Sequence, residues 1–394
     1  MSSVIRHVAE SIGPASRANA EAARAAVAHA GAPMLDRLAA ALGGAQHQPR
    51  PRADKTIVVV AAGDHGVGDP GIAMGADHPT IIAAREIAAG TAALNQLARA
   101  ARTPVVLIDA GAKESAHMPA TAVALGRGAT RDLMREPAMT IVDATLGIEA
   151  GIALAMSLLE PDPMASPRGS DANIGAGAHT GAGSNIDSAI AAATSIRPNA
   201  PAGFSAVLAI GAIGVGAEVA SAALLGAITG RVPRLGDDQA ELAGHRGIEH
   251  RRFATEPITE PLPTLAGWAE GSGALPPQHA DDLEASALEL LATFGGSETA
   301  VLVGLLLGAA SINVPVILDS YATGAAALIA ARIAPNITGY LVAAHRGSFT
   351  MPAILDYLKL QPIFEVGLGH GEGSGAAMVL PLVEQVAVLA APRV

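Results

Sequence analysis

The chain of 394 residues contains no cysteine, which excludes disulfide bonds, thiolate catalysis and cysteine-ligated zinc. Aromatic residues are scarce, with one Trp, three Tyr and five Phe, so the core must be built from Ala, Val, Leu and Ile. Clustered basic residues are also missing: the longest run is Arg251-Arg252, and the net charge is −11. A nucleic-acid-binding face needs Lys and Arg gathered on one surface. We therefore expect no nucleic-acid partner.

The first residues, Met1-Ser-Ser-Val-Ile-Arg-His7, lack the apolar core of a signal peptide, which predicts a cytoplasmic protein. Two stretches with few charges, Thr299–Leu318 and Ala206–Gly230, are long enough to cross a membrane. Asn313-Val-Pro315 interrupts the first, and a cluster of glycines interrupts the second. Buried parallel strands are continuously apolar. Each stretch therefore predicts a core helix beside a core strand, and no membrane contact.

What the sequence does contain is an alternation of valine-rich runs of strand length with alanine-rich helical segments. This alternation predicts an α/β fold with a doubly wound parallel sheet, in which ligands bind at the carboxyl ends of the strands. The predicted strands are Thr56–Ala62, Pro104–Ala110, Ser205–Gly211, Val314–Asp319, Ile337–Ala344 and Pro362–Val366. The predicted helices between them are Pro79–Ala101, Ile148–Leu159, Glu218–Thr229, Asp281–Phe294, Glu298–Ala310, Ala322–Ile333, Thr350–Leu358 and Ser374–Ala391.

Three segments stand apart from this alternation. Residues 1–45 form an alanine-rich helical segment that we expect to pack on the C-terminal helix, residues 371–394. The chain termini would then form a small helical subdomain beside an α/β domain of residues 55–370. Within that domain, residues 160–203 are rich in Gly, Pro and Ser and lack apolar periodicity, which predicts a flexible insertion. A lid over the functional site is the alternative for this segment.

The most informative segment is the glycine-rich run that places Glu372 between Gly371 and Gly373, just before an apolar helical run. Glycine lets the backbone turn tightly and approach a ligand, and a single acid at a helix entry suits a general base. The alternative is a structural turn, in which Glu372 stabilises the helix N-terminus electrostatically.

Polar residues follow the first predicted strand. Asp64 and His65, between glycines, could position a ribose or orient a general acid; the alternative is a turn that Asp64 fixes by accepting backbone N–H groups. No second ligand stands at metal-binding spacing from His65, so we predict no metal site.

Glycines follow the third strand. Gly214 and Gly216 open a helix, and N–H groups at such a start can hold a phosphate. The carboxylate of Glu218 would repel that phosphate. No acid follows at the spacing of a dinucleotide site, so we predict no Rossmann-type cofactor. Near the end of the chain, His345 and Arg346 follow a strand and supply a cation that suits a phosphate; an ordinary charged loop is the alternative.

Taken together, seven segments resemble the nicotinate-nucleotide–dimethylbenzimidazole phosphoribosyltransferase family, which makes α-ribazole phosphate for the lower ligand of cobamides. The resemblance runs from about residue 55 to the C-terminus, outside residues 160–203. The segments are Gly63–Val67, Gly90–Arg99 with Val105–Asp109, Gly126–Gly128, Pro137–Met139, Pro315–Asp319, Ala344–Arg346 and Gly371–Ala377.

The resemblance implies that Glu372 is the general base, and that phosphoribose passes from nicotinate mononucleotide to an aromatic base without a metal or other cofactor. It also implies a homodimer. The residues expected to bind the substrate or its phosphate are Asp64, His65, Gly214, Gly216, His245, Asp319, His345, Arg346, Gly371 and Gly373.

The chain departs from the family pattern at the expected site. A second active-site acid of the family is Ala212 here, the family's Asn-Thr-Thr is Ala217-Glu-Val219, and a lysine near the phosphate is His245. Two functions follow from these departures. One is a phosphoribosyltransferase with an altered substrate. The other is a non-catalytic homologue that binds a nucleotide or a partner protein.

Overall fold

The computed structural model of the protein describes residues 1–68, 72–126, 128–160, 205–229, 283–347, 350–365, 368 and 372–392. In this part of the chain, six parallel strands form a sheet in the order β3-β2-β1-β4-β5-β6. The strands are β1 (Lys55–Gly63), β2 (Val105–Gly111), β3 (Val123–Ala124), β4 (Ala206–Ile213), β5 (Val316–Leu318) and β6 (Leu341–Ala343). The predicted α/β fold with a parallel sheet is confirmed.

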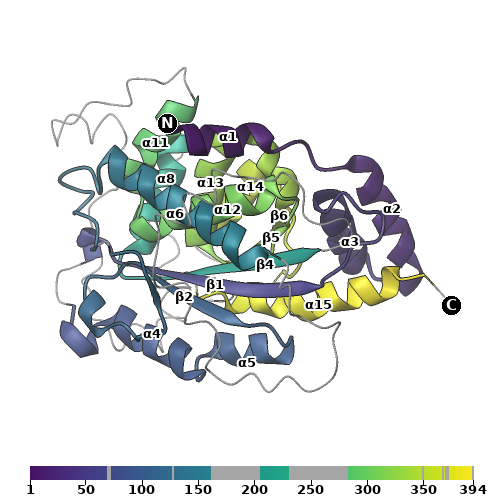
Figure 1. The fold of residues 1–394 in the computed structure, drawn as a ribbon, viewed down its shortest axis with the longest axis horizontal. Helices are drawn as coiled ribbons and strands as arrows, with labels where there is room; N and C mark the ends of the chain where they lie inside the picture. The colour runs from purple at the N-terminus through teal and green to yellow at the C-terminus, as the bar shows by residue number, and fades with distance from the viewer. Residues whose placement is uncertain are drawn as a thin grey trace.

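Helices cover both faces of the sheet (Figure 1). Successive side chains of a strand point to opposite faces, so Val59 of β1 packs in one core while Val58 and Val60 pack in the other. The first core contains α1 (Ser3–Ser11), α6 (Ile141–Leu159), α8 (Ala217–Thr229), α11 (Leu283–Phe294), α12 (Ser297–Ser311), α13 (Tyr321–Ile333) and α14 (Met351–Leu358). The second contains α2 (Arg17–Val27), α3 (Pro33–Ala45), α4 (Pro79–Ala89), α5 (Ala93–Ala100) and α15 (Ser374–Ala390).

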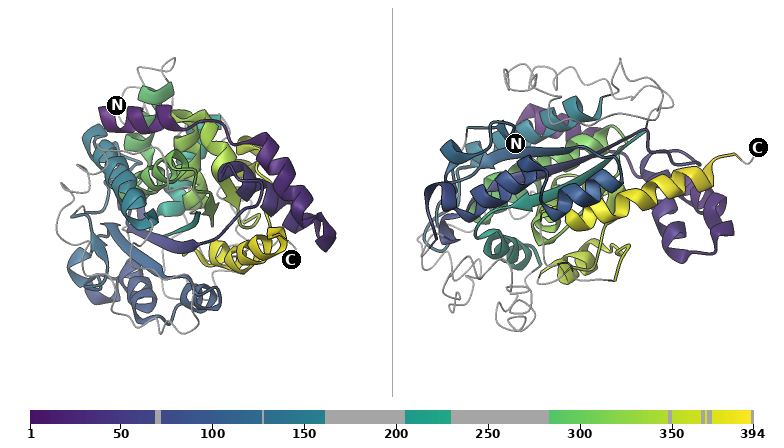
Figure 2. Two further views of the ribbon diagram at one scale, coloured as in Figure 1. Left: turned by 45° about the vertical axis from the view of Figure 1, so that its right-hand side comes forward. Right: turned by 90° about the horizontal axis from the view of Figure 1, so that it is seen from below.

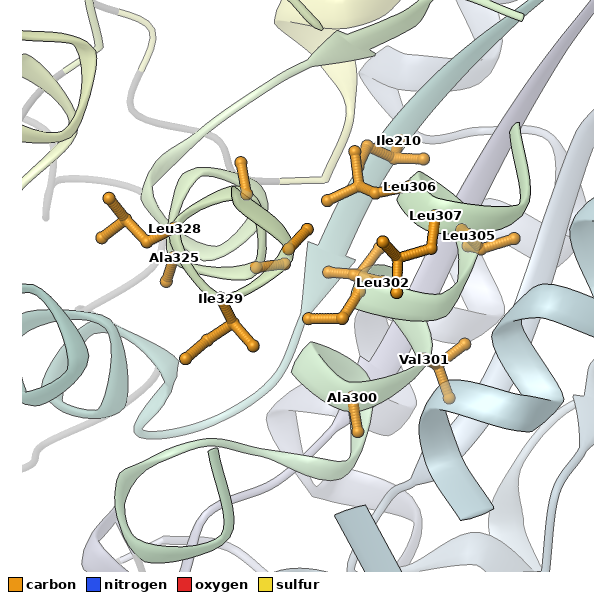
Figure 3. Packing of buried hydrophobic residues seen from close by; sticks show 14 of the residues in the cluster. Ile210, Ala300, Val301, Leu302, Leu305, Leu306, Leu307, Ala325, Leu328 and Ile329 are labelled. Carbon is orange, nitrogen blue, oxygen red and sulfur yellow. The ribbon is translucent and has the colours of Figure 1, made fainter. Parts of the chain in front are cut away.

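The helix α12 lies at the centre of the first core, and every one of its residues is buried. Figure 3 shows Leu306 of α12 beside Ile210 of β4, and Leu302 on the side of α12 toward Ile329 of α13. The two stretches with few charges therefore fold inside the protein, as the sequence predicts: one contains most of α12 together with β5, and the other contains β4 and α8.

One helix in the described part of the chain, α6, is long and apolar enough to cross a membrane. Within the protein it packs along α12 with its small residues. A Cβ built on Gly147 would overlap the side chain of Ala300, and one built on Gly151 would overlap the backbone at Val301. Because α6 packs this closely on α12, its apolar sequence is that of a core helix.

Several element boundaries differ from the predicted ones. The predicted helix Pro79–Ala101 is divided into α4 and α5, because Gly90 ends α4 in the left-handed conformation, with φ of 74°. The helix α6 begins seven residues earlier than predicted, at a capping box formed by Thr140 and Asp143.

The last two predicted strands are also shorter than expected. Residues Pro335–Tyr340 form a 3₁₀ helix before β6, in place of the first half of the predicted strand. The predicted strand Pro362–Val366 is reduced to a single bridge between Phe364 and His345 in its described residues. The strand β3, of two residues, was not predicted.

The chain termini meet beside the sheet. The helices α2 and α3 pack together, and both contact α15 (Figure 1). The first helix, α1, lies instead against α12 and α6, on the face of the sheet opposite α15 (Figure 2). The boundaries of the subdomain remain a prediction, and the proposed insertion lies outside the described residues after Glu160.

The contact between α6 and α12 yields a first prediction. A Cβ at Gly304 would overlap the backbone of α6 at Ile148 and Gly151. We expect Gly304→Ala to lower the free energy of unfolding by about 1–3 kcal/mol, since overpacking outweighs the better helix propensity of alanine. Gly13 has no heavy atom within 4 Å of a built Cβ. Gly13→Ala is therefore the control, with an expected change within about 0.5 kcal/mol in urea unfolding. Equal stability of the two variants would contradict this account.

Candidate active site

The strands β1, β4, β5 and β6 are neighbours in the sheet, so the loops after their carboxyl ends lie along one edge. The turn before α15 reaches the same edge, where the N–H of Gly373 donates to Asp319. The predicted site residues that this edge carries are Asp64, His65, Gly214, Gly216, Asp319, His345, Arg346, Glu372 and Gly373. Two further predicted residues, His245 and Gly371, lie outside the described residues.

Glu372 lies in the turn before α15, directly against the end of β4. A Cβ built on Gly211 would come within 2.5 Å of the backbone of Glu372 and Gly373. Gly373 has φ of 102°, a conformation that favours glycine. Glu372 itself is partly exposed. A partly exposed carboxylate on a closely packed turn suits a general base.

Asp319, after β5, holds this turn in place. Its Oδ2 accepts a hydrogen bond from the N–H of Gly373 at 3.1 Å, and its Oδ1 accepts one from the N–H of Ala376 at 2.9 Å. The side chain is fully buried. Burial raises the pKa of Asp319 to about 6, although the backbone donors Ala376, Gly373 and Gly375 act to lower it. The geometry makes Asp319 a cap of α15, and its role in substrate binding stays a prediction.

Around His345, after β6, two helices begin close together. The ring of His345 lies against α15, where a Cβ on Gly375 would overlap it. The helix α14 begins nearby, since a Cβ on Gly347 would come within 2.9 Å of Met351. The hydroxyl groups of Thr350 and Ser374 are buried and have no hydrogen-bond partner among the described residues. Helix N-termini with spare hydroxyl groups suit a phosphate.

Arg346 follows His345 and points outward. Its side chain is 52% exposed, and its Nη1 lies 4.0 Å from Oε2 of Glu365. Its N–H donates to the carbonyl of Phe364 at 3.0 Å, which anchors the backbone of this loop. A half-exposed guanidinium at this edge can attract an anionic ligand, while its weak surface ion pair contributes little to stability.

Asp64 is buried and ties three elements together. Its Oδ2 accepts a hydrogen bond from the N–H of Lys113 after β2 at 2.8 Å, and its Oδ1 accepts one from the N–H of Val215 after β4 at 2.9 Å. The hydroxyl group of Thr80 in α4 also donates to Oδ1. Nδ1 of His78 lies 3.8 Å from Oδ2. These contacts correspond to the structural alternative for Asp64, that of a carboxylate fixing strand ends.

His65 forms a buried ion pair. Its Nε2 lies 3.1 Å from Oε1 of Glu298, in the first turn of α12, and both side chains are buried. Burial lowers the pKa of His65, but the charge of Glu298 and the hydrogen bond to it outweigh burial, and the pKa is raised, with further help from Asp64 and Glu218. Burial raises the pKa of Glu298, but the charge of His65 outweighs it and the pKa is lowered. Both shifts favour the charged pair.

The loop between β4 and α8 crosses over the end of β1. A Cβ on Gly214 would overlap the carbonyl of Gly63, and Gly216 has φ of 83°. Glu218, in the first turn of α8, is partly exposed. Ala212, which stands where the resemblance expects a second acid, is 6% exposed.

Reasoning from the sequence missed Glu298, Thr80 and the hydroxyl groups of Thr350 and Ser374. Glu298 follows Gly295-Gly296 at the start of an apolar helix, and this pattern was a usable signal, because glycines there allow close packing. A Cβ on Gly296 would overlap Glu298 and the ring of His65. The described residues hold no group of three or more His, Asp or Glu side chains placed for a metal ion.

Comparison with known proteins gives a consistent result. A family model described as Phosphoribosyltransferase matches residues 11–165 and 273–392. The nicotinate-nucleotide–dimethylbenzimidazole phosphoribosyltransferase of Roseiflexus sp. (strain RS-1) is 30% identical over 358 residues, which cover 88% of this chain and 82% of the relative. The protein of the same name from Desulforudis audaxviator is 27% identical over 404 residues, covering 98% and 95%.

A solved structure shares the fold. The crystal structure of the nicotinate-nucleotide–dimethylbenzimidazole phosphoribosyltransferase from Thermus thermophilus matches with a TM-score of 0.64 at 24% identity. The match covers 98% of this chain and 95% of that chain. The parallel α/β architecture is therefore common to both.

The buried Asp319 yields a second prediction. Its pKa is raised from 3.8 to about 6, so its protonated form favours folding: this stabilisation is complete below pH 3.8 and is lost as the pH rises through 6. We expect the unfolding free energy of the wild type, relative to Asp319→Asn, to fall by about 2 kcal/mol between about pH 4.5 and about pH 7.5. Guanidinium unfolding at each pH measures this difference.

The same variant tests the position of the turn. Asn can accept only one of the two N–H bonds, so Glu372 should move and kcat should fall roughly tenfold to hundredfold. The exposed Asp356 of α14 provides the control Asp356→Asn, for which neither effect is expected. A wild-type kcat in Asp319→Asn would mean that the turn does not depend on Asp319.

Proposed function

The chain belongs to the phosphoribosyltransferase family, and on this premise we propose that it transfers phosphoribose from nicotinate mononucleotide to an aromatic base, for the lower ligand of cobamides. The observation that carries the proposal is the placement of Glu372. Its turn packs on Gly211 of β4 and is bonded to Asp319 after β5. Among the described residues, this gives one partly exposed acid a fixed position at the carboxyl edge of the sheet.

In the proposed reaction, a ring nitrogen of the acceptor attacks C1 of the ribose. The bond between C1 and the nicotinate nitrogen breaks, and its electron pair neutralises the pyridinium, which makes nicotinate a good leaving group. The proton on the other ring nitrogen of the acceptor passes to the carboxylate of Glu372. A positioned general base of this kind contributes roughly 10²–10⁴-fold to the rate.

We place the phosphate of the nucleotide near His345 and Arg346. Support comes from the starts of α14 and α15, which lie close to His345, and from the buried hydroxyl groups of Thr350 and Ser374. Hydroxyl and N–H donors at helix starts complement a phosphate without a lysine. Arg346, half exposed at the rim, would add its charge.

We also propose that the acceptor differs from dimethylbenzimidazole. The support is the replacement of the family acid by Ala212 and the carboxylate of Glu218 at the start of α8. Incubation with nicotinate mononucleotide and a panel of benzimidazoles, phenols and purines, with released nicotinate measured, tests the proposal. If no acceptor in the panel causes nicotinate release, the result would favour the non-catalytic alternative, a homologue that only binds a nucleotide or a partner protein.

A third prediction concerns Glu372 itself. Glu372→Gln keeps the size of the side chain but removes the basic oxygen, so kcat with the best acceptor should fall about 10²–10⁴-fold. Nicotinate release under saturating substrates measures the loss, and circular dichroism checks the fold. Glu384→Gln, on the same helix and also partly exposed, is the matched control and should keep full activity. Near-normal turnover in Glu372→Gln would make this acid structural.

We further propose that the enzyme is a cytoplasmic homodimer. Three of the six exposed large hydrophobic side chains in the described part of the chain lie at the start of α6: Ile141, Val142 and Leu146. Such a cluster on one helix favours contact with another protein surface.

A fourth prediction tests this surface. Val142 is 66% exposed, so Val142→Glu should leave the fold intact but place a charge within the proposed interface. We expect the molar mass measured by light scattering to fall from dimer to monomer at micromolar concentration. The control is Val388→Glu on α15, which is 74% exposed and stands outside the cluster. A dimer that survives Val142→Glu excludes this surface, and a monomeric wild type excludes the dimer.

A further inference from the structure

The ion pair of His65 and Glu298 takes no part in the proton transfer at Glu372. Its two side chains are 0% and 1% exposed. A buried ion pair carries a large desolvation cost, and well-packed apolar replacements are often neutral or stabilising. Stability alone is therefore a weak explanation for an ion pair in the core of this protein. The position of the pair beside the loop between β4 and α8 suggests a second explanation.

The backbone of His65 fixes the loop between β4 and α8. Its N–H donates to the carbonyl of Val215 at 2.9 Å, while the N–H of Val215 donates to Asp64. The side chain of His65 also lies close to this loop, since a Cβ built on Gly216 would come within 3.0 Å of Cβ of His65. The loop that opens α8 thus rests directly on His65.

The ring of His65 has a defined orientation beneath this loop. Nε2 faces Glu298 from α12, and the hydroxyl group of Thr299 donates to the same carboxylate oxygen at 2.7 Å. The other acids that act on the ring are Asp64, next to it in the chain, and Glu218 from the first turn of α8. His78, just before α4, lies near Asp64, with 3.8 Å between its Nδ1 and Oδ2 of Asp64.

At the start of α8, two groups act on an anion in opposite directions. The N–H groups of a glycine loop at a helix start attract an anion, whereas the carboxylate of Glu218 in the same turn repels one. A positive charge on His65 acts against that repulsion, because Glu218 stands two residues after Gly216, which packs on Cβ of His65.

We propose that His65 is a positioning residue of the reaction. Its backbone fixes the Gly214–Gly216 loop, and its ring, paired with Glu298, offsets the carboxylate of Glu218, so that an anionic group of the nucleotide binds at the start of α8. This inference rests on the proposed function, because it requires that the nucleotide reach this loop. Nicotinate mononucleotide carries two anionic groups. Because its 5′-phosphate is placed near His345 and Arg346, the group at the start of α8 is the ring carboxylate.

Two variants of the full chain separate charge from packing. Glu298→Gln keeps the shape of the partner but removes its charge. The double variant His65→Leu with Glu298→Met replaces the pair by apolar side chains of similar volume, which is expected to preserve folding. In both, KM for nicotinate mononucleotide should rise about tenfold or more, the size of an interaction with a charged group. The value of kcat should change little, as expected when binding alone is lost.

The pH profile distinguishes this role from a merely structural one. His65 loses its charge as the pH rises through its raised pKa, so KM of the wild type should increase at that point. Without the charge of Glu298, burial lowers the pKa of His65, and the increase in Glu298→Gln should begin at lower pH. Titration of Asp319 acts equally on both proteins and cancels in the comparison. An unshifted profile overturns the proposal, as does a wild-type KM in the double variant.

Substrate analogues identify the anionic group. Nicotinate riboside lacks the phosphate, and nicotinamide mononucleotide lacks the carboxylate. The effect of Glu298→Gln on KM should persist with nicotinate riboside and disappear with nicotinamide mononucleotide; an effect that persists with nicotinamide mononucleotide overturns the proposal.

Calorimetric binding of nicotinate mononucleotide separates this inference from the proposed function. If the wild type releases no nicotinate but binds the nucleotide more tightly than both variants, only the transferase proposal fails. If all three proteins bind it equally, the positioning role of His65 fails, whatever the turnover.

Discussion

The constraint on which the site depends is the burial of Asp64 at the end of β1. A buried carboxylate is costly unless its oxygens are bonded, and here the donors are the N–H groups of Lys113 and Val215 and the hydroxyl group of Thr80. These donors come from the loops after β2 and β4 and from α4. Satisfying one charge therefore requires three other segments to take fixed positions, and the edge of the sheet becomes a rigid base for the loops above it.

Asp319 repeats this arrangement two strands away, with a different result. Its oxygens bond the start of a helix, where the N–H groups have no partner within the helix. Capping α15 in this way fixes the turn that carries Glu372, and Gly211 of β4 allows the same turn to pack directly on the strand. The buried Asp319 thus holds the backbone of the turn, and Glu372 on the same turn is partly exposed.

The sequence predicted the sheet well because buried strands and alanine-rich helices have distinct apolar patterns, and it located the edge residues because strand ends are marked by glycine and polar turns. The sequence did not distinguish residues that hold the backbone in place from residues that bind a ligand. Asp64 and Asp319 look like ligands in the sequence, and only the structure shows that both are buried and accept hydrogen bonds from backbone N–H groups. Glu298 was missed for a related reason: it pairs with His65 across 233 positions of the chain, a contact that no local pattern encodes.

The scarcity of basic residues, with which the sequence begins, has a consequence at this edge. An anionic nucleotide needs positive potential, and the chain has a net charge of −11 with no basic cluster. Beside the half-exposed Arg346, the donors found at the edge among the described residues are helix starts, buried hydroxyl groups and one histidine paired with an acid. Such fixed dipoles are aligned before the substrate arrives, so they lose little side-chain entropy on binding, unlike long lysine side chains. Recognition of this type depends on backbone position more than on charge count, which is why the buried acids and close glycine contacts matter to the chemistry as well as to the fold.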